Sequence, residues 1–372
     1  MNPTRKNDVW GTPRTNRVFV VFAVALGVVA ALAAGVAGVL RADWTTSYAG
    51  YAAGGVFVEI PRGMGEAEIA RLLASSGVVR SEQSFRALEI WHGQMRLEAG
   101  EYRFEKPETP EQVFDTLAHG RIYLVSVTVP EGETMFEIAV QLDAKEVTKR
   151  AEFLAAARSK ALVADLAPGA PTLEGFLFPA TYQFARHQPG EKIAEAMVRR
   201  FREAWSRTVE ALPDDRKPTA AFGPLEAVTL ASLVEKETGV PEERALVASV
   251  FRNRLRKKIA LDCDPTVIYA LELAGKYNGR LLLADLHVDS PYNTYRRRGL
   301  PPGPIANPGE AAMRAALDPA PGDWLYFVAT GDGGHTFSRT LAEHNKNVAK
   351  YRQKEAQARR AARAHAGGRP AR

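Results

Sequence analysis

Cysteine is almost absent from this chain of 372 residues, because Cys263 stands alone. A single cysteine excludes an intramolecular disulfide framework and a cysteine-rich zinc module. The sequence also lacks a G-x-S-x-G elbow, an H-E-x-x-H motif and a Walker A loop. These absences argue against serine hydrolases, zinc proteases and P-loop nucleotide-binding proteins. Cys263, His335 and His344 are therefore expected to have structural roles, and no metal or other cofactor is expected.

Excess positive charge is confined to the two ends of the chain. The net charge is +6, of which residues 1–17 carry +3 and residues 350–372 carry +7, which leaves −4 for residues 18–349. A negative body has no general attraction for phosphate backbones, so nucleic acid is not expected as a partner. Hydrophobic residues at 46% and charged residues at 25% are typical of a folded globular protein.

Charge is entirely missing from residues 18–40, a run of 23 residues. At a rise of about 1.5 Å per residue, a helix of this length spans about 34 Å, enough to cross a membrane. The alternative is a cleaved signal peptide, whose apolar region is usually about 7–15 residues long. The basic residues of 1–17 precede the run, so we expect a cytoplasmic N-terminus and an extracytoplasmic body in a bacterial inner membrane, crossed once.

Two stretches that follow the apolar run are alike. After a small-residue linker at 41–55, VEIPRGMGEAEIARLL begins at Val58 and VTVPEGETMFEIAVQL begins at Val127. Each predicts a short strand, a Pro-x-Gly turn and an amphipathic helix, and a second short helix follows, carrying Phe85 or Phe153. The second copy resembles the first half of a LysM module, a small peptidoglycan-binding unit. Residues 56–164 are therefore described as LysM-like, with a plain strand–helix spacer as the alternative.

Residues 165–349 have a different pattern from the region before them: short apolar stretches alternate with loops rich in proline and glycine. We expect a buried helix over 225–234, a strand over 324–329 and a second strand over 335–338. Helices and strands are mixed without a βαβ rhythm, which favours an α+β fold. The basic tail at 350–372 is expected to be a solvated helix end.

One carboxyl group stands out on the predicted helix of this region. The apolar segment runs directly into Glu235, which shares a helix face with Val228 and Ala231. Burial of a carboxyl group raises its pKa, as a general acid near neutral pH requires. The alternative is that the helix simply ends here, with Glu235 and Glu237 in solvent and Gly239 as the stop signal.

Two further stretches offer groups suited to sugar recognition. Glu174 lies beside a glycine in the aromatic-rich stretch 173–179, and the stretch 289–296 contains Asn293 and Tyr295. Rings stack on pyranose faces and amides bond hydroxyl groups, although such clusters also serve only to pack long loops. We take Glu174, Glu237, Asn293 and Tyr295 as residues that line or support a glycan cleft.

Several motifs together resemble the YceG-like family of endolytic murein transglycosylases. They keep their order from about residue 57 to 350, and they are LEGFLFPATY at 173–182, ASLVEKET at 231–238, VFRNRL at 250–255, DPTVIYAL at 264–271, YNTYRRRGLPPGPIANPG at 292–309 and GHTFSRTLAEHN at 334–345. Two residues depart from the family pattern: Ala180 stands where an acidic residue is usual, and Asp262 stands where a glutamine is usual.

The resemblance implies an α+β enzyme anchored in the membrane that cleaves the MurNAc–GlcNAc bond of nascent glycan strands. It implies that Glu235 is the essential acid, that 1,6-anhydroMurNAc ends are formed, and that 165–349 is the catalytic domain. A penicillin-binding peptidoglycan synthase is the protein partner that such an activity suggests. Two rival hypotheses remain, a muramidase that uses Glu174 or Glu237 as a second carboxylate, and a non-catalytic LysM-like scaffold.

Overall fold

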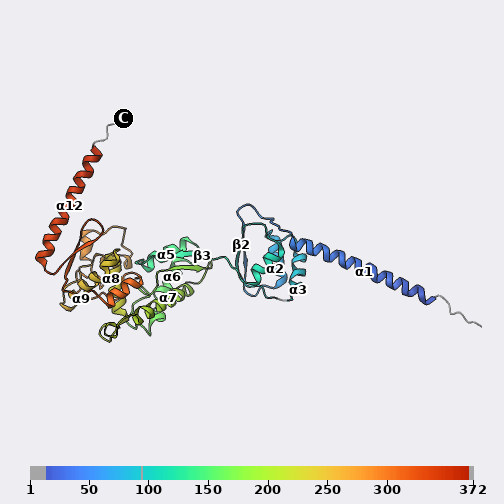
Figure 1. Cartoon of the computed structure of the whole chain (residues 1–372), viewed down its shortest axis with the longest axis horizontal. Helices are drawn as coiled ribbons and strands as arrows, with labels where there is room; N and C mark the ends of the chain where they lie inside the picture. Colours follow the sequence, from blue (N-terminus) through green and yellow to red (C-terminus); the bar gives the residue numbers. More distant parts are fainter. Residues whose placement is uncertain (1–13, 94, 368–372) are drawn as a thin grey trace, which may run out of the picture. The chain divides into compact units, whose positions relative to one another are not determined.

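The computed structural model describes residues 14–93 and 95–367. The chain divides into two compact units, the first ending at Tyr123 and the second beginning at Leu124 (Figure 1). The first contains α1 (Arg14–Thr45), β1 (Val56–Ile60), α2 (Glu66–Ser75), α3 (Glu82–Trp91), β2 (Gly100–Phe104) and α4 (Pro110–Ala118). The second begins with β3 (Val125–Thr128), α5 (Met135–Ala144), α6 (Arg150–Ala157), β4 (Thr181–Phe184) and α7 (Gly190–Glu210). It continues with α8 (Pro224–Glu237), α9 (Arg244–Arg256), α10 (Asp264–Leu273), α11 (Glu310–Leu317), β5 (Tyr326–Ala329), β6 (His335–Ser338) and α12 (Leu341–Gly367). The mixed helix and strand content confirms the expected α+β character.

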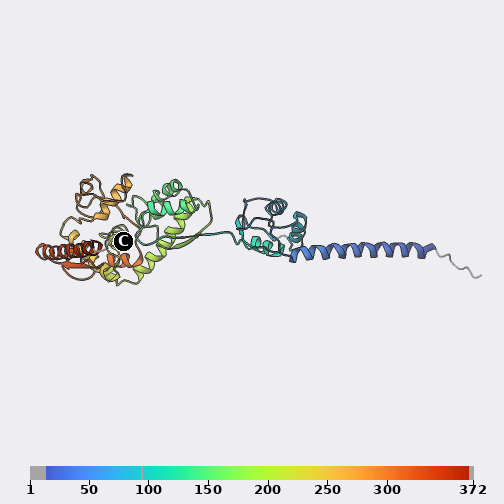
Figure 2. The same ribbon diagram turned by 90° about the horizontal axis from the view of Figure 1, so that it is seen from above.

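Helix α1 contains the charge-free run. Its segment Val18–Thr45 is long and apolar enough to cross a membrane, and none of the described residues buries its most apolar window. Figure 2 shows it as one unbroken helix. A single N-terminal apolar helix is consistent with single-pass anchoring.

Residues 41–55 are packed, although we expected a linker. The Trp44 ring lies in the core of the first unit, and its Nε1–H donates to the Ser84 carbonyl at 2.9 Å. Further on, the Gly50 N–H donates to the Gly77 carbonyl at 2.8 Å. Gly77 has a positive φ of 71°, and a Cβ there would lie 2.7 Å from the Gly50 carbonyl carbon, so two glycines allow these segments to meet. The small residues of this stretch therefore permit close packing.

The two related stretches form two βααβ units. The Pro-x-Gly turns are equivalent, with φ of +84° at Gly63 and +82° at Gly132. Phe85 and Phe153 are fully buried on the second helices, as the shared pattern predicted. Each copy also closes with a strand that we did not expect: β2 pairs antiparallel with β1, and β4 pairs antiparallel with β3.

The closing strands repeat as well. Val58 faces Tyr102 in the first pair, and Val127 faces Tyr182 in the second. Each tyrosine hydroxyl donates to the carbonyl four residues earlier, at 2.7 Å to Glu98 and 2.6 Å to Phe178. The duplication therefore covers the whole βααβ unit, although 23 residues separate Ala157 from β4 and only eight separate Trp91 from β2.

The boundary between compact units differs from the one expected at 164/165. Val127, Met135 and Phe153 of the second copy belong to the same hydrophobic core as α7 and α8. The first copy has a core of its own around Phe85. Sequence similarity suggested that the two copies form one region. In the structure the first copy packs within its own core, and the second packs with α7 and α8.

Helix α8 is buried where the sequence predicted it. Every side chain from Ala227 to Val234 is buried, because α8 packs against α9, α10 and α11. The strand expected over 324–329 is observed as β5 over Tyr326–Ala329, and it pairs antiparallel with β6, which was expected over 335–338. Helix α12 begins beside these strands, and its residues up to Arg360 are mostly exposed. The end of the expected basic tail, residues 368–372, lies outside the described residues.

Candidate functional site

Glu235 lies in the last turn of α8, where the buried part of the helix ends. Its side chain is only 5% exposed. One carboxyl oxygen, Oε2, accepts from the Gly309 N–H at 3.0 Å, and the other, Oε1, accepts from Arg244 Nη2 at 3.3 Å. Gly309 is the N-cap residue of α11, and Arg244 begins α9. Three helix ends therefore meet at this carboxylate.

The Pro-x-Gly turn of the second βααβ unit packs against Glu235. A Cβ on Gly132 would lie 3.5 Å from Glu235 Cγ. The Gly132 carbonyl accepts from Lys236 Nζ at 3.1 Å, and its N–H donates to the Asn307 carbonyl at 2.8 Å. The turn is thus held against both α8 and the segment that leads into α11.

Glu131, in the same turn, is a second carboxylate beside Glu235 that sequence reasoning missed. Its Oε2 lies 3.6 Å from the Arg244 Nη2 that also contacts Glu235. It packs so closely on Gly309 that a Cβ there would overlap its carboxyl group. Burial raises the pKa of Glu131, the charges of Glu235 and Glu310 raise it further, and Arg244 lowers it.

A signal for Glu131 was present in the repeat. The equivalent position of the first copy holds Arg62, 69 residues earlier. An opposite charge at one position of two otherwise matching turns indicates that the position serves different purposes in the two copies.

Glu174 supports the site from the interior. It is 1% exposed, and both of its oxygens accept from the Met135 N–H, at 3.1 and 3.0 Å, at the start of α5. Asn307 Nδ2 donates to it at 2.8 Å. Burial raises the pKa of Glu174 to about 8, although the Met135 hydrogen bond lowers it. Of the two roles expected for Glu174, its burial excludes lining a cleft and leaves that of a support.

Asn307 is a further residue that the sequence analysis did not select. It is fully buried. Its Oδ1 accepts from the Gly175 and Leu177 N–H groups at 2.8 and 3.0 Å, and its Nδ2 also donates to the Glu133 carbonyl at 2.9 Å. One amide thereby joins the 173–179 stretch to the turn at Glu235.

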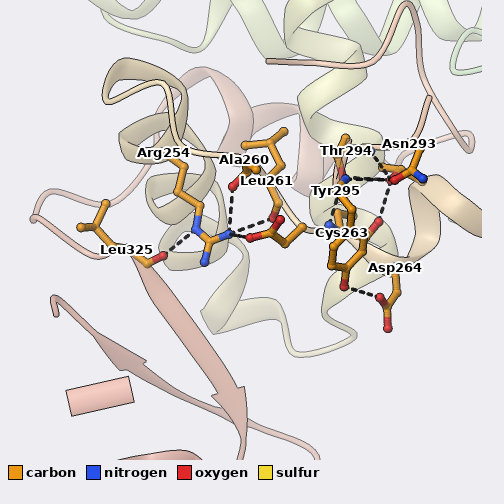
Figure 3. A network of polar contacts seen from close by, with 11 residues as sticks. Arg254, Ala260, Leu261, Cys263, Asp264, Asn293, Thr294, Tyr295 and Leu325 are labelled. Carbon is orange, nitrogen blue, oxygen red and sulfur yellow. Dashed lines mark hydrogen bonds and ion pairs between the residues drawn. The ribbon is translucent and has the colours of Figure 1, made fainter. Parts of the chain in front are cut away.

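Glu237 and Tyr295 line a separate cavity of about 480 Å³ that does not include Glu235. The Tyr295 hydroxyl donates to Asp264 at 2.5 Å (Figure 3). Burial raises the pKa of the Tyr295 phenol, and the hydrogen-bonded Asp264 raises it further. Burial also raises the pKa of Glu237, against a lowering hydrogen bond from Cys263.

Asn293 supports this cavity but is not one of the residues that line it. It is fully buried, and its Nδ2 donates to the carbonyls of Leu286 and Val288 at 3.0 and 2.8 Å. Its Oδ1 accepts from the Tyr295 N–H at 3.0 Å. Asn293 therefore holds the loop from which Tyr295 projects.

The two departures from the family pattern are accommodated. Asp262 has a positive φ of 52° and pairs with Arg254 at 3.1 Å, while Arg254 also donates to the Leu325 carbonyl at 2.7 Å (Figure 3). Asp262 also lines the cavity of Glu237 and Tyr295. At Ala180 the backbone makes the contact: its carbonyl accepts a hydrogen bond from the Val129 N–H at 3.0 Å.

His335, His344 and Cys263 have surroundings within the protein that suit structural roles. His335 Nδ1 lies 2.7 Å from Glu243, the His344 ring stacks on Tyr326, and Cys263 is buried. Among residues 14–93 and 95–367, no group of three or more histidine, cysteine, aspartate or glutamate side chains is arranged to hold a metal ion.

Comparison with known proteins gives one consistent family. The model of the YceG-like family matches residues 58–350. The endolytic murein transglycosylase of Bacillus subtilis (strain 168) is 35% identical over 312 residues, which cover 80% of this chain and 84% of the relative. The Streptococcus pneumoniae (strain D39) protein of that name is 30% identical over 328 residues, and the match spans 58% of its length.

A solved structure agrees with these relatives. The crystal structure of a YceG-like protein from Listeria monocytogenes matches with a TM-score of 0.52 at 34% identity. The match covers 79% of this chain and 99% of the other.

Proposed function

Because this chain belongs to the YceG-like family, we propose that it is a peptidoglycan lytic transglycosylase. It cleaves the MurNAc–GlcNAc bond within nascent glycan strands, leaves 1,6-anhydroMurNAc ends and so terminates strand elongation. The observation that carries this proposal for the site is the nearly buried carboxyl group of Glu235 where α8, α9, α11 and the Gly132 turn meet.

Glu235 acts first as an acid and then as a base. The protonated carboxyl group donates its proton to the glycosidic oxygen, so the GlcNAc side leaves as an alcohol from an oxocarbenium-like state. The resulting carboxylate accepts the proton of the muramyl C6 hydroxyl as that oxygen bonds to C1. The carboxyl group is thereby restored, and the nucleophile comes from the substrate.

We propose that the cavity of Glu237 and Tyr295 contacts the glycan. It combines aromatic faces at Tyr295 and Tyr326 with the carboxylates of Asp262 and Asp264. Such groups stack on sugar rings and accept hydrogen bonds from sugar hydroxyls. Glu174 and Asn293 are buried and support the glycan site indirectly, by holding α5 and the loop of Tyr295.

Hydrolysis is the second candidate, and one observation favours it: Glu131 lies beside Glu235 on the same guanidinium group. Two-carboxylate glycosidases use a second acid at about 5–5.5 Å or about 6.5–9.5 Å. Glu174 is enclosed in the core and Glu237 lines another cavity, so Glu131 is the better second acid for that mechanism. Hydrolysis leaves reducing ends, whereas lytic cleavage leaves anhydro ends.

We propose that the first βααβ unit, which lies in the region 56–164 described as LysM-like, also binds glycan. It has a groove of about 1000 Å³ beside the Gly63 turn. Arg62 and Arg96 lie at this groove together with Glu89, whose Oε1 is buried with no hydrogen-bond partner among the described residues. Burial raises the pKa of Glu89 to about 7, and Glu66 raises it further.

We also propose that α1 is a retained anchor in the bacterial inner membrane, with a cytoplasmic N-terminus and both units outside. The basic residues of 1–17 before the apolar run support this orientation. An enzyme anchored there meets glycan strands as they are made, so we expect a penicillin-binding synthase as its lateral partner.

Product analysis of Glu235→Gln tests the main proposal. The full chain in detergent would be incubated with purified glycan strands, and the products identified by mass spectrometry. Wild type should give anhydro-muramyl ends, and Glu235→Gln should lose at least about 100-fold in rate, because a general acid–base group contributes 10²–10⁴-fold.

Glu210→Gln is the matched control, since Glu210 is exposed on α7. It should retain wild-type turnover. Reducing ends from the wild-type chain would replace the lytic mechanism by hydrolysis. Unchanged turnover in Glu235→Gln would remove Glu235 from the chemistry, and folded but inactive wild-type protein would favour the non-catalytic scaffold.

A further inference from the structure

Two donors hold the side chain of Glu235 in the structure. A guanidinium group and a backbone N–H both donate to it, at 3.3 and 3.0 Å. Hydrogen bonds of this kind stabilise the negative form of an acid. The proposed reaction nevertheless begins with proton donation from Glu235, so the contact with Arg244 has to be relieved when the enzyme is ready to cleave.

Arg244 is placed to move away from Glu235. The same nitrogen, Nη2, serves both Glu235 and Glu131, at 3.3 and 3.6 Å, so neither contact is a two-nitrogen clamp. Its Nε is buried and has no hydrogen-bond partner among the residues that the structure describes. A guanidinium held through one nitrogen can shift between neighbouring acceptors at small cost, whereas a bidentate pair could not.

We propose that Arg244 shifts from Glu235 to Glu131 when the enzyme carries the catalytic proton, and that Glu131 is a positioning residue that makes this shift possible. The inference rests on the proposed function of Glu235. With Arg244 on Glu131, the guanidinium group no longer donates to Oε1 of Glu235. That oxygen is then free to carry the catalytic proton.

The charged groups around Glu131 agree with this role. From α8 it faces Glu235, from α9 Arg244, and from α11 Glu310. Lys236 donates to the Gly132 carbonyl and Glu310 pairs with Arg207, so their charges are already engaged. Arg244 is therefore the cation for which the two carboxylates compete.

Glu131 and Glu235 also differ in how far their side chains are exposed to solvent. The Glu131 side chain is 48% exposed, and the Glu235 side chain is 5% exposed. Glu131 can therefore hold Arg244 at the solvent-facing edge of the site, whereas Glu235 stays enclosed. The first βααβ copy, which carries Arg62 at the equivalent position, lacks this acid.

The pH dependence of kcat in Glu131→Gln tests the proposal. The full chain in detergent would be assayed on purified glycan strands from about pH 5 to 9. Without the Glu131 charge, Arg244 stays on Glu235, so the alkaline limb of the profile should move about one pH unit toward acid. Activity at pH 8 should then fall about tenfold, while the acidic plateau, KM and the anhydro ends stay unchanged.

Two variants make the result decisive. Glu131→Asp keeps the charge and should restore most of the wild-type profile, and Glu242→Gln removes an exposed neighbouring carboxylate and should leave it unchanged. A wild-type limb in Glu131→Gln, or a loss of the same factor at every pH, would overturn the role of Glu131. If wild type itself gives no anhydro ends, the proposed function fails and this inference fails with it.

Discussion

At the scale of single residues, the site depends on polar groups that are fully enclosed. Glu174 and Asn307 connect the 173–179 stretch, the start of α5 and the turn beside Glu235. A buried polar network of this kind is stable only when its members are satisfied, since each orphaned group costs about 1–3 kcal/mol. The geometry of the Glu131–Glu235 region therefore depends on residues that are enclosed in the core.

The Glu174 carboxyl group should make the stability of the second unit depend on pH. Its pKa is raised from 4.5 to about 8, so the folded protein binds a proton that the unfolded chain releases near pH 4.5. Its contribution is complete below about pH 4.5 and is lost as the pH rises toward 8. We expect the unfolding free energy to decrease over this range by up to about 1.4 kcal/mol per pH unit.

Glu174→Gln should flatten this dependence, because an amide does not titrate. Denaturant unfolding of the full chain at pH 5, 6, 7 and 8 would measure the slope, with Glu210→Gln as the exposed control. Glu272, whose pKa burial raises to about 7, contributes to the slope of both proteins equally. An identical slope in wild type and Glu174→Gln would show that Glu174 stays ionised in the folded state.

At the scale of elements, the same βααβ unit serves two purposes. In the second copy the Pro-x-Gly turn faces α8 and brings Glu131 to Glu235. In the first copy the equivalent turn borders an open groove. The long connection between α6 and β4 contains Glu174, whose carboxyl group accepts from the Met135 N–H at the start of α5. The residue equivalent to Met135 in the first copy is Glu66, at the start of α2. The longer connection of the second copy therefore supplies the buried carboxyl group that meets the helix following its turn.

The end of α1 is a structural part of the first unit. Trp44→Ala should remove a buried indole and its hydrogen bond to Ser84, at a cost of about 3 kcal/mol. Amide hydrogen exchange in α3 should then accelerate about 100-fold in the detergent-solubilised chain. Ile90→Ala on the exposed face of α3 is the control and should change exchange by less than about threefold. Unchanged α3 protection in Trp44→Ala would mean that α1 is not anchored to this unit.

At the scale of the whole molecule, the chain joins an apolar helix, a unit with an open groove and a unit with Glu235, the candidate catalytic acid. The two units have separate hydrophobic cores, so each is held together by its own buried residues. Glycan binding by the first unit would add to that of the second through a higher effective concentration of substrate.

Arg62→Ala combined with Arg96→Ala should test glycan binding by the first unit. The double variant and its control would be made in a Glu235→Gln background, so that substrate is not consumed. Sedimentation would measure how much of each full-length protein binds to insoluble peptidoglycan. Loss of two charged donors should weaken binding about tenfold. Arg121→Ala, outside the groove, is the control and should bind normally. Equal retention of all three proteins would contradict a glycan site in this groove.

Local patterns in the sequence were sufficient for much of the fold. The charge-free run predicted the apolar helix, the continuous apolar stretch predicted buried α8, and the shared Pro-x-Gly pattern predicted the first strand and both helices of each copy. The motif that ends α8 identified Glu235 as the candidate acid. Each of these features depends on residues within a few turns or strands of one another.

Tertiary structure alone decided which distant groups meet. Asn307 bonds to Glu133 across 174 positions of the chain, and Glu131 packs on Gly309. The closing strands β2 and β4, the burial of Glu174 and the sharing of Arg244 by two acids likewise depend on long-range contacts. Helical and strand periodicity records only which face of an element is buried, and which partner buries that face is decided when the core assembles.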